Sequence, residues 1–211
     1  MLWTARDQSV RTPMVGRQRP GYPQSMRGLA VTLVLLPAIL LSGVAPAQTV
    51  PNPATVLEFG AREPAWSPRN DTVMGGVSSS RVRVLDGVLA FTGQVRLENN
   101  GGFSGIRSTP GRFDLSGFSA LRLRVRGDGK RYALQLGNST VNGVTYRGEF
   151  DTLAGQWTEV TVPLGTLRPT RSGERVAGPT LDPGRVIFFG LTVGNNRVEG
   201  FALEVDWIRG E

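Results

Sequence analysis

The sequence predicts an all-β protein in which one domain folds as an antiparallel sandwich or barrel of about ten short strands, with few and short helices. Three observations favour this fold class. Short apolar or alternating segments recur along the chain and are separated by dipeptides that are typical of turns. The 211 residues include 28 glycines and 14 prolines. No segment repeats its apolar residues with the 3.6-residue period of an amphipathic helix.

The expected strands are short segments that can each bury one face, namely residues 56–59, 81–85, 88–97, 103–108, 120–126, 132–136, 145–150, 158–163, 186–193 and 201–208. Turn-forming residues separate many of them: Asp86-Gly87, Asn100-Gly101-Gly102, Asp128-Gly129, Asn142-Gly143, Ala154-Gly155 and Asn195-Asn196. These turns make antiparallel connections between neighbouring strands the simplest expectation.

Residues 120–126 (ALRLRVR) show the alternation most clearly. Successive side chains of a strand point to opposite faces, so its leucines and valine share one face and its three arginines share the other. We expect a half-buried strand whose arginines pair with acidic residues on neighbouring strands. The alternative is a row of arginines that binds an anionic ligand.

An apolar run, residues 29–41 (LAVTLVLLPAILL), follows Arg27 and precedes an A-x-A site that ends at Ala47. This order of segments is typical of a secretory signal peptide, so we predict cleavage after Ala47 and a periplasmic or secreted protein. The alternative is an uncleaved membrane anchor at residues 29–41, although a spanning helix needs about 20 apolar residues. Met26 is an alternative start, because MRGLAVTLV is a more ordinary beginning for a signal peptide.

The chain is therefore expected to contain a leader (1–47), a polar linker (48–55) and a single domain (56–209). The leader holds five arginines and one aspartate, so +4 of the net charge of +7 belongs to it. The remaining charge is small and scattered, whereas nucleic-acid binding needs a basic surface, so we predict no nucleic-acid partner. We expect membrane contact only through the leader before cleavage.

The chain contains neither cysteine nor histidine. This composition excludes Ser-His-Asp and Cys-His catalytic groups, metal sites built from His or Cys, and disulfides. Hydrolysis by paired carboxylates is the main enzyme chemistry left, but nothing in the sequence places two carboxylates across a cleft. We therefore predict a protein that is not an enzyme and has no cofactor. A structural calcium ion would suit a sandwich, yet the sequence has no D-x-D-x-D-G loop.

Residues 66–78 (WSPRNDTVMGGVS) are richer in polar groups and glycine than a turn requires. Asn70 and Asp71 can accept hydrogen bonds from nearby backbone amides, and the two glycines allow a close backbone approach. The structural interpretation is an ordered loop that enters a strand, with Trp66 and Met74 in the core. The functional interpretation is a ligand-binding loop.

Residues 97–108 (LENNGGFSGIRS) contain a second polar loop. Glu98, Asn99 and Asn100 supply carboxylate and amide groups, and Arg107 lies across the expected turn. This set suits a ligand rich in hydroxyl groups. The structural alternative is a wide hairpin turn closed by an ion pair between Glu98 and Arg107.

An Arg-Gly-Asp tripeptide occurs at residues 126–128. Asp128-Gly129 lies between two expected strands, and Asp-Gly is one of the strongest short signals for a β-hairpin. We therefore predict a hairpin turn here and not an adhesion motif.

The motifs NDTVMGGVS (70–78), LENNGGF (97–103) with Arg107, RGDG (126–129) and GFALEVDWI (200–208) occur together in this order. With them, the chain resembles the complex I intermediate-associated protein family over about residues 56–209. The resemblance implies a galactose-binding-like jelly-roll β-sandwich. It also implies a protein that is not an enzyme, because the mitochondrial member of the family is an assembly factor for NADH:ubiquinone oxidoreductase.

Two functions are consistent with these observations. The first is a binding domain of the cell envelope that recognises a protein or a glycan through its loops, since function in such folds lies in loops. A glycan-binding site would combine a stacking aromatic ring with amide and carboxylate groups, and the candidate residues are Trp66, Asn70, Asp71, Glu98, Asn99, Asn100 and Arg107. The second is a chaperone-like assembly factor that presents a broad, partly apolar face to a protein client.

Overall fold

The computed structural model describes residues 54–60 and 64–211. The predicted leader, the cleavage site at Ala47, the alternative start at Met26 and most of the linker lie outside these residues. Within the described part of the chain, no helix has the length and apolar character needed to cross a membrane.

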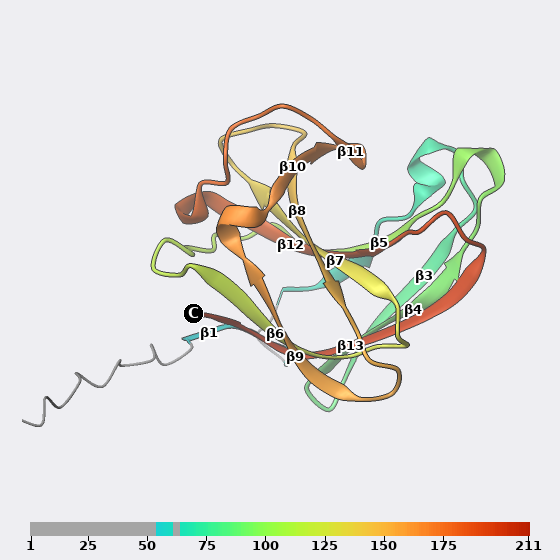
Figure 1. Cartoon of the computed structure of the whole chain (residues 1–211), viewed down its shortest axis with the longest axis horizontal. Helices are drawn as coiled ribbons and strands as arrows, with labels where there is room; N and C mark the ends of the chain where they lie inside the picture. Colours follow the sequence, from blue (N-terminus) through green and yellow to red (C-terminus); the bar gives the residue numbers. More distant parts are fainter. Residues whose placement is uncertain (1–53, 61–63) are drawn as a thin grey trace, which may run out of the picture. The chain divides into compact units, whose positions relative to one another are not determined.

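The domain is a sandwich of two antiparallel sheets (Figure 1). One sheet has six strands in the order β3-β4-β13-β6-β9, and β1 also pairs with the long strand β13. Its strands are β1 (Ala54–Glu58), β3 (Ser79–Leu85), β4 (Val88–Val95), β6 (Ala120–Arg126), β9 (Trp157–Pro163) and β13 (Glu199–Gly210).

The other sheet has seven strands in the order β11-β10-β8-β7-β12-β5-β2. They are β2 (Trp66–Pro68), β5 (Ser104–Ser108), β7 (Arg131–Asn138), β8 (Thr145–Asp151), β10 (Arg168–Arg171), β11 (Glu174–Arg175) and β12 (Val186–Val193). The helical segments of the described residues are single 3-10 turns: η1 (Asp71–Met74), η2 (Glu98–Asn100), η3 (Leu164–Thr166) and η4 (Pro183–Arg185). The predicted all-β sandwich is confirmed.

Each of the ten expected strands corresponds to an observed strand whose ends lie within two residues of the expected ones. Three strands were not predicted: β2, β10 and β11. Each is only two to four residues long, and Pro169 of β10 cannot donate a ladder hydrogen bond, which is a signal against a strand.

Strand β6 has the alternation expected for a half-buried strand. Leu121, Leu123 and Val125 are fully buried between the sheets, where they belong to the single large core cluster of the described residues. The arginines of β6 face outward, and acidic partners neutralise them: Arg126 pairs with Glu204, Arg124 with Asp206, and Arg122 with Glu211 at 2.6 Å and Glu159 at 3.5 Å. The predicted cross-strand pairing is confirmed, which removes the main reason to expect an anion-binding row on this face.

The predicted hairpin at Asp128-Gly129 is wrong, because β6 and β7 belong to different sheets. The turn instead carries the chain from the six-stranded sheet to the seven-stranded sheet. Gly129 has a φ of +85°, so the expected tight turn at Asp128-Gly129 is present. A tight turn can join two sheets as well as two paired strands, and the dipeptide does not distinguish these cases.

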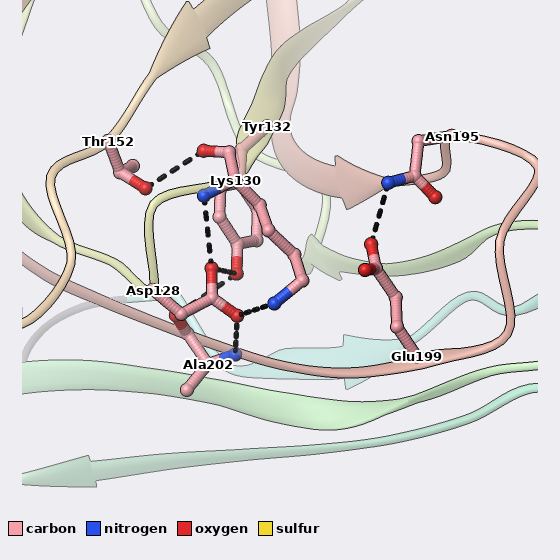
Figure 2. A network of polar contacts seen from close by, with 7 residues as sticks. All are labelled: Asp128, Lys130, Tyr132, Thr152, Asn195, Glu199 and Ala202. Carbon is pink, nitrogen blue, oxygen red and sulfur yellow. Dashed lines mark hydrogen bonds and ion pairs between the residues drawn. The ribbon is translucent and has the colours of Figure 1, made fainter.

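The carboxylate of Asp128 fixes this crossing (Figure 2). It accepts hydrogen bonds from Lys130 Nζ at 2.6 Å, from the Lys130 backbone N–H at 3.3 Å and from the Ala202 N–H at 3.1 Å. The Tyr132 hydroxyl lies 2.9 Å from the same carboxylate and 3.0 Å from the carbonyl oxygen of Ala202. The carboxylate therefore joins the turn to β13 of the six-stranded sheet.

Two further side-chain hydrogen bonds lie near this crossing between the sheets. Thr152 Oγ1 donates to the Lys130 carbonyl at 2.8 Å, and Asn195 Nδ2 donates to Glu199 Oε1 at 2.6 Å (Figure 2). Burial of Asp128 by itself would raise the pKa of its carboxyl, but the hydrogen bonds from Lys130, Tyr132 and Ala202 outweigh burial and lower that pKa. Burial, together with the neighbouring Asp128 charge, raises the pKa of the Tyr132 hydroxyl.

We predict that Asp128→Ala lowers the free energy of unfolding by about 3 kcal/mol, because several donors lose a charged acceptor at once. Because the folded pKa of Asp128 is below the ordinary value of 3.8, its contribution is complete above pH 3.8. The contribution disappears as the pH falls through the folded pKa. The stability difference between the wild type and Asp128→Asn, measured by urea unfolding, should therefore shrink on acidification. Glu174→Ala, on the exposed strand β11, is the control, and equal losses for Asp128→Ala and Glu174→Ala would contradict the prediction.

Candidate functional site

The candidate site is the surface of the seven-stranded sheet that points away from the core, which we call the outer face. Neighbouring strands are in register along one row of this face, so its side chains project from the same side. The row runs across six strands in the order Ser67, Arg107, Gly190, Gln135, Arg147 and Arg168. Their sequence neighbours, such as Leu134, Leu136 and Leu191, point into the core.

Small residues occupy the centre of the outer face, and longer polar side chains lie over them. Gln135 Oε1 is 3.4 Å from the position that a Cβ atom would take at Gly190. The Arg107 guanidinium lies 4.0 Å from the centre of the Phe188 ring, which is only 9% exposed. Burial and the charge of Arg69 lower the pKa of Arg107, although an arginine remains protonated at neutral pH. The face therefore offers hydrogen-bonding groups where a stacking ring would otherwise be exposed.

Two polar atoms associated with this face are buried and have no hydrogen-bond partner in the described structure. They are Thr192 Oγ1 and Arg147 Nε. Thr192 is 7% exposed and lies between Gly105 and Ala133 in the adjacent strands. Most buried polar atoms in folded proteins have a partner, so these two are points at which a ligand could supply one.

Ion pairs neutralise the charges along β8. Arg131 of β7 forms two hydrogen bonds with Asp151, at 2.8 and 2.9 Å, and lies 3.8 Å from Glu149. Arg147 Nη2 donates to Glu149 at 3.2 Å, which leaves its Nε free. Glu149 therefore already has two cationic neighbours and adds little negative charge to the outer face.

A pocket of about 420 Å³ opens beside the end of β10, which is within the size range of small-ligand sites. Its polar lining comes mainly from Arg147, Arg168 and Arg175, with Glu149, Thr166 and Thr170. The Thr170 hydroxyl lies 2.9 Å from that of Thr145, so β10 holds these side chains on the outer face.

Asn70, one of the predicted binding residues, uses its side-chain oxygen inside the domain. Asn70 Oδ1 accepts hydrogen bonds from Ser80 Oγ at 2.8 Å, from Ser104 Oγ at 2.7 Å and from the Gly105 N–H at 3.3 Å. Because Ser80 belongs to β3 and Ser104 to β5, this amide joins the two sheets.

Asp71 is fully buried and has a similar role. Its carboxylate accepts hydrogen bonds from the Ser78 hydroxyl, the Ser78 N–H at 3.0 Å and the Gly102 N–H at 2.8 Å. A Cβ atom at Gly76 or Gly101 would lie 2.5 or 2.7 Å from this carboxylate, so only glycine fits beside it. Burial alone would raise the pKa of Asp71, but the hydrogen bonds from Ser78 and Gly102 lower it.

The other loop candidates are exposed around η2. Asn99 and Asn100 adopt positive φ angles of 58° and 60°, which asparagine tolerates better than most residues. Asn99 Nδ2 also donates to the Gly75 carbonyl at 3.2 Å and so joins the two polar loops. Glu98 pairs with Arg96 at 3.6 Å, so the expected pair between Glu98 and Arg107 is wrong.

Trp66 packs against the core beside Phe59, at a ring separation of 6.0 Å, and its buried indole N–H has no described partner. Its expected place in the core is confirmed. Met74 is 51% exposed, so the expectation that it fills the core is wrong. A single 3-10 turn at η1 presents its side chains outward, because Asp71 occupies the inward position.

The seven predicted residues therefore do not form one group. Asn70, Asp71 and Asn99 meet in the polar loops, Trp66 packs against the core, and Arg107 lies on the outer face. Whether any of them binds a ligand stays a prediction. Four residues of the outer face were not predicted from the sequence: Gln135, Arg147, Arg168 and Thr192. Alternation in β7, β8 and β12 could have placed three of them outside, but the register that aligns them was not visible in the sequence.

Among the described residues, no group of three or more acidic side chains is arranged to hold a metal ion. The outer face thus offers arginine, amide and hydroxyl groups and no metal centre within that part of the chain. Such groups bind and orient a ligand by hydrogen bonds and charge.

This two-layer antiparallel fold defines a galactose-binding-like β-sandwich. A family model described as complex I intermediate-associated protein 30 (CIA30) matches residues 57–205, and the chain belongs to this family. The family resemblance noted in the sequence is therefore confirmed. No curated protein sequence matched the chain.

Several solved structures share the fold. The family 11 carbohydrate-binding module of the cellulase Lic26A-Cel5E of Clostridium thermocellum aligns with a TM-score of 0.55 and 13% identity, over 76% of this chain and 95% of the module. The Clostridium thermocellum module in complex with a β-1,3-1,4-mixed-linked tetrasaccharide gives 0.55 and 14%, over 75% and 95%. The agarase AgWH50C gives 0.52 and 10%, over 75% of this chain but 24% of the agarase. At these identities the similarity concerns the fold alone.

We predict that Asp71→Ala lowers the free energy of unfolding by about 3 kcal/mol or more, because it leaves buried Ser78 and Gly102 donors without an acceptor. Asn100→Gly should change it by less than about 0.5 kcal/mol, since glycine adopts positive φ without strain. Both values can be measured by urea denaturation. An Asp71→Ala variant as stable as Asn100→Gly would show that the buried carboxylate does not hold the loops.

Proposed function

We propose that this chain is a non-enzymatic binding domain and that its ligand, a hydroxyl-rich chain such as a glycan, lies on the outer face. The observation that carries the proposal is the pair of buried, unpartnered polar atoms, Thr192 Oγ1 and Arg147 Nε. Both are associated with a face whose central residues are small and whose longer side chains are polar. A sugar hydroxyl can both donate and accept hydrogen bonds, so it can satisfy either atom once the side chains that cover that atom move aside.

One finding and one prediction support a glycan. The carbohydrate-binding modules named above share the sandwich, and one of them was solved with a bound tetrasaccharide. The predicted signal peptide would place the domain outside the cytoplasm, where polysaccharides of the envelope are accessible.

Thr192→Val tests this proposal, because valine has nearly the same shape and lacks only the unpartnered hydroxyl. We expect the variant to be as stable as the wild type or up to about 1 kcal/mol more stable, since a buried unsatisfied group is removed. We also expect its affinity for the oligosaccharides that bind the wild type on a glycan array to fall about fivefold or more, which is about 1 kcal/mol.

Thr92→Val is the matched control, because Thr92 is exposed on β4 of the other sheet. It should leave both stability and binding unchanged. If no oligosaccharide binds the wild type, or if Thr192→Val binds as well as the wild type does, the glycan proposal fails.

A second candidate, assembly of a protein complex, is favoured by the family and by one separate observation. Four apolar side chains are exposed where the two polar loops meet, at Val73, Met74, Val77 and Leu97, and Val73 is 76% exposed. The bond from Asn99 to the Gly75 carbonyl holds these loops together. An exposed apolar cluster of this kind is typical of a surface that contacts another protein.

We expect Val73→Ser together with Met74→Ser to reduce the amount of assembled membrane complexes on native gels if this surface serves assembly. Val84→Ser with Leu85→Ser is the matched control, since both residues are exposed near the β3–β4 turn. Unchanged complexes in a strain that lacks the protein would contradict the assembly role. Changed complexes in the control strain alone would show that the loop surface is not the contact.

A further inference from the structure

The pocket beside β10 has a distinctive charge. Its three arginines come from three adjacent strands, β8, β10 and β11. The register of the strands places these arginines together on the outer face. Arg168 is directly opposite Arg147 on the neighbouring strand. Thr170 is two residues after Arg168 and so shares its face, and Thr170 is directly opposite Arg175. Among the described residues that line the pocket, Glu149 is the only acidic one. The lining therefore carries an excess of positive charge.

The fold does not neutralise this charge. Arg147 shares Glu149 with Arg131, whereas Arg168 and Arg175 form no ion pair with any described residue. Arg147 and Arg168 are also like charges at directly opposite positions of an antiparallel pair, an arrangement that destabilises a sheet. By contrast, in the six-stranded sheet every arginine of β6 pairs with an acidic side chain of β13 or with Glu211.

The buried Arg147 Nε adds a second, independent observation. One edge of this guanidinium donates to Glu149, but its Nε–H has no partner among the described residues. The Nε–H shares an edge of the guanidinium with Nη2, which already donates to Glu149, so the Nε–H is the donor that remains for an oxygen of a carboxylate or sulfate. A buried unpartnered donor beside two unpaired arginines thus points to a ligand with negatively charged oxygens.

The burial of the aromatic residues also favours a charged ligand over a neutral one. No aromatic side chain of the described residues is more than partly exposed, and Phe188, the ring on the outer face, is 9% exposed and lies beneath Arg107. A neutral sugar is commonly held by stacking on an exposed ring, for which this face provides no surface. Recognition here must rely on charge and hydrogen bonds.

We propose that the pocket binds an oxyanion, a carboxylate or a sulfate ester, carried by the glycan chain on the outer face. This inference rests on the proposed function and narrows the ligand to an acidic polysaccharide. Arg168 and Arg175 contribute charge, Arg147 contributes the Nε donor, and the anion separates the facing charges of Arg147 and Arg168.

Calorimetric titration with three probes tests the inference: an oligogalacturonate for the carboxylate, a sulfated dextran oligomer for the sulfate, and a neutral mixed-linked tetrasaccharide. We expect the wild-type protein to bind at least one acidic probe about tenfold or more tightly than the neutral one. Raising the salt concentration should reduce this preference, because exposed charges are screened.

The variant that combines Arg168→Ala and Arg175→Ala should bind the acidic probe about tenfold less tightly and so lose the preference for the acidic probe over the neutral one. The control combines Arg81→Ala and Arg83→Ala, which removes the same charge from exposed positions on β3 of the other sheet. The control should bind the acidic probe like the wild type. Equal circular dichroism spectra and melting temperatures establish that both variants fold.

The possible outcomes separate the two proposals. If the neutral and acidic probes bind equally well and the Arg168/Arg175 variant binds like the wild type, the oxyanion pocket is refuted while the glycan proposal stands. If the control loses as much affinity as the pocket variant, binding follows overall charge and the pocket is again refuted. If none of the probes and no glycan on the array binds, the proposed function fails and the oxyanion inference fails with it.

Discussion

Each strand of a two-layer sandwich can bury only one of its faces, and this constraint determines where the protein can interact with a partner. The inward faces of both sheets form one core, to which strands of each sheet contribute. The outward faces then have two options: their polar residues pair with each other, or they remain available. The six-stranded sheet takes the first option along β6, where acidic residues of β13 and the C-terminal Glu211 neutralise the arginines. The seven-stranded sheet takes the second option around β10.

Two carboxylates and one amide hold the sheets together at the places where the chain crosses between them. Asp71 and Asn70 bind hydroxyl and amide groups that come from both sheet edges, and Asp128 joins the β6–β7 crossing to β13. Because each acceptor serves several donors, one side chain replaces many of the contacts that a loop would otherwise need. Cysteine is absent from the whole chain, so these networks and the core supply the order that disulfides give many small domains.

The sequence predicted the fold class and ten strands because alternation and turn dipeptides are local signals. It did not predict β10, since Pro169 argues against a strand and only the pairing with β8 compensates for it. For the site, residue chemistry alone was misleading. Asn70 and Asp71 have the groups that bind a ligand, but the same groups are needed to satisfy buried donors nearby. Arg168 and Thr192 gave no signal, because their importance comes from register between strands that are distant in sequence.

The two candidate functions depend on two different surface clusters, the arginines of the pocket and the exposed apolar residues of the polar loops. An unneutralised arginine cluster and an exposed apolar cluster both lower stability or solubility, so neither is explained by the needs of the fold. They lie on different parts of the sandwich, one beside β10 and β11 and the other where η1 and η2 meet (Figure 1). The side chains of one cluster do not line the other, so mutations in each can be interpreted separately. Under the two proposals an acidic polymer binds at the sheet and a protein binds at the loops, and loss of either contact leaves the other intact.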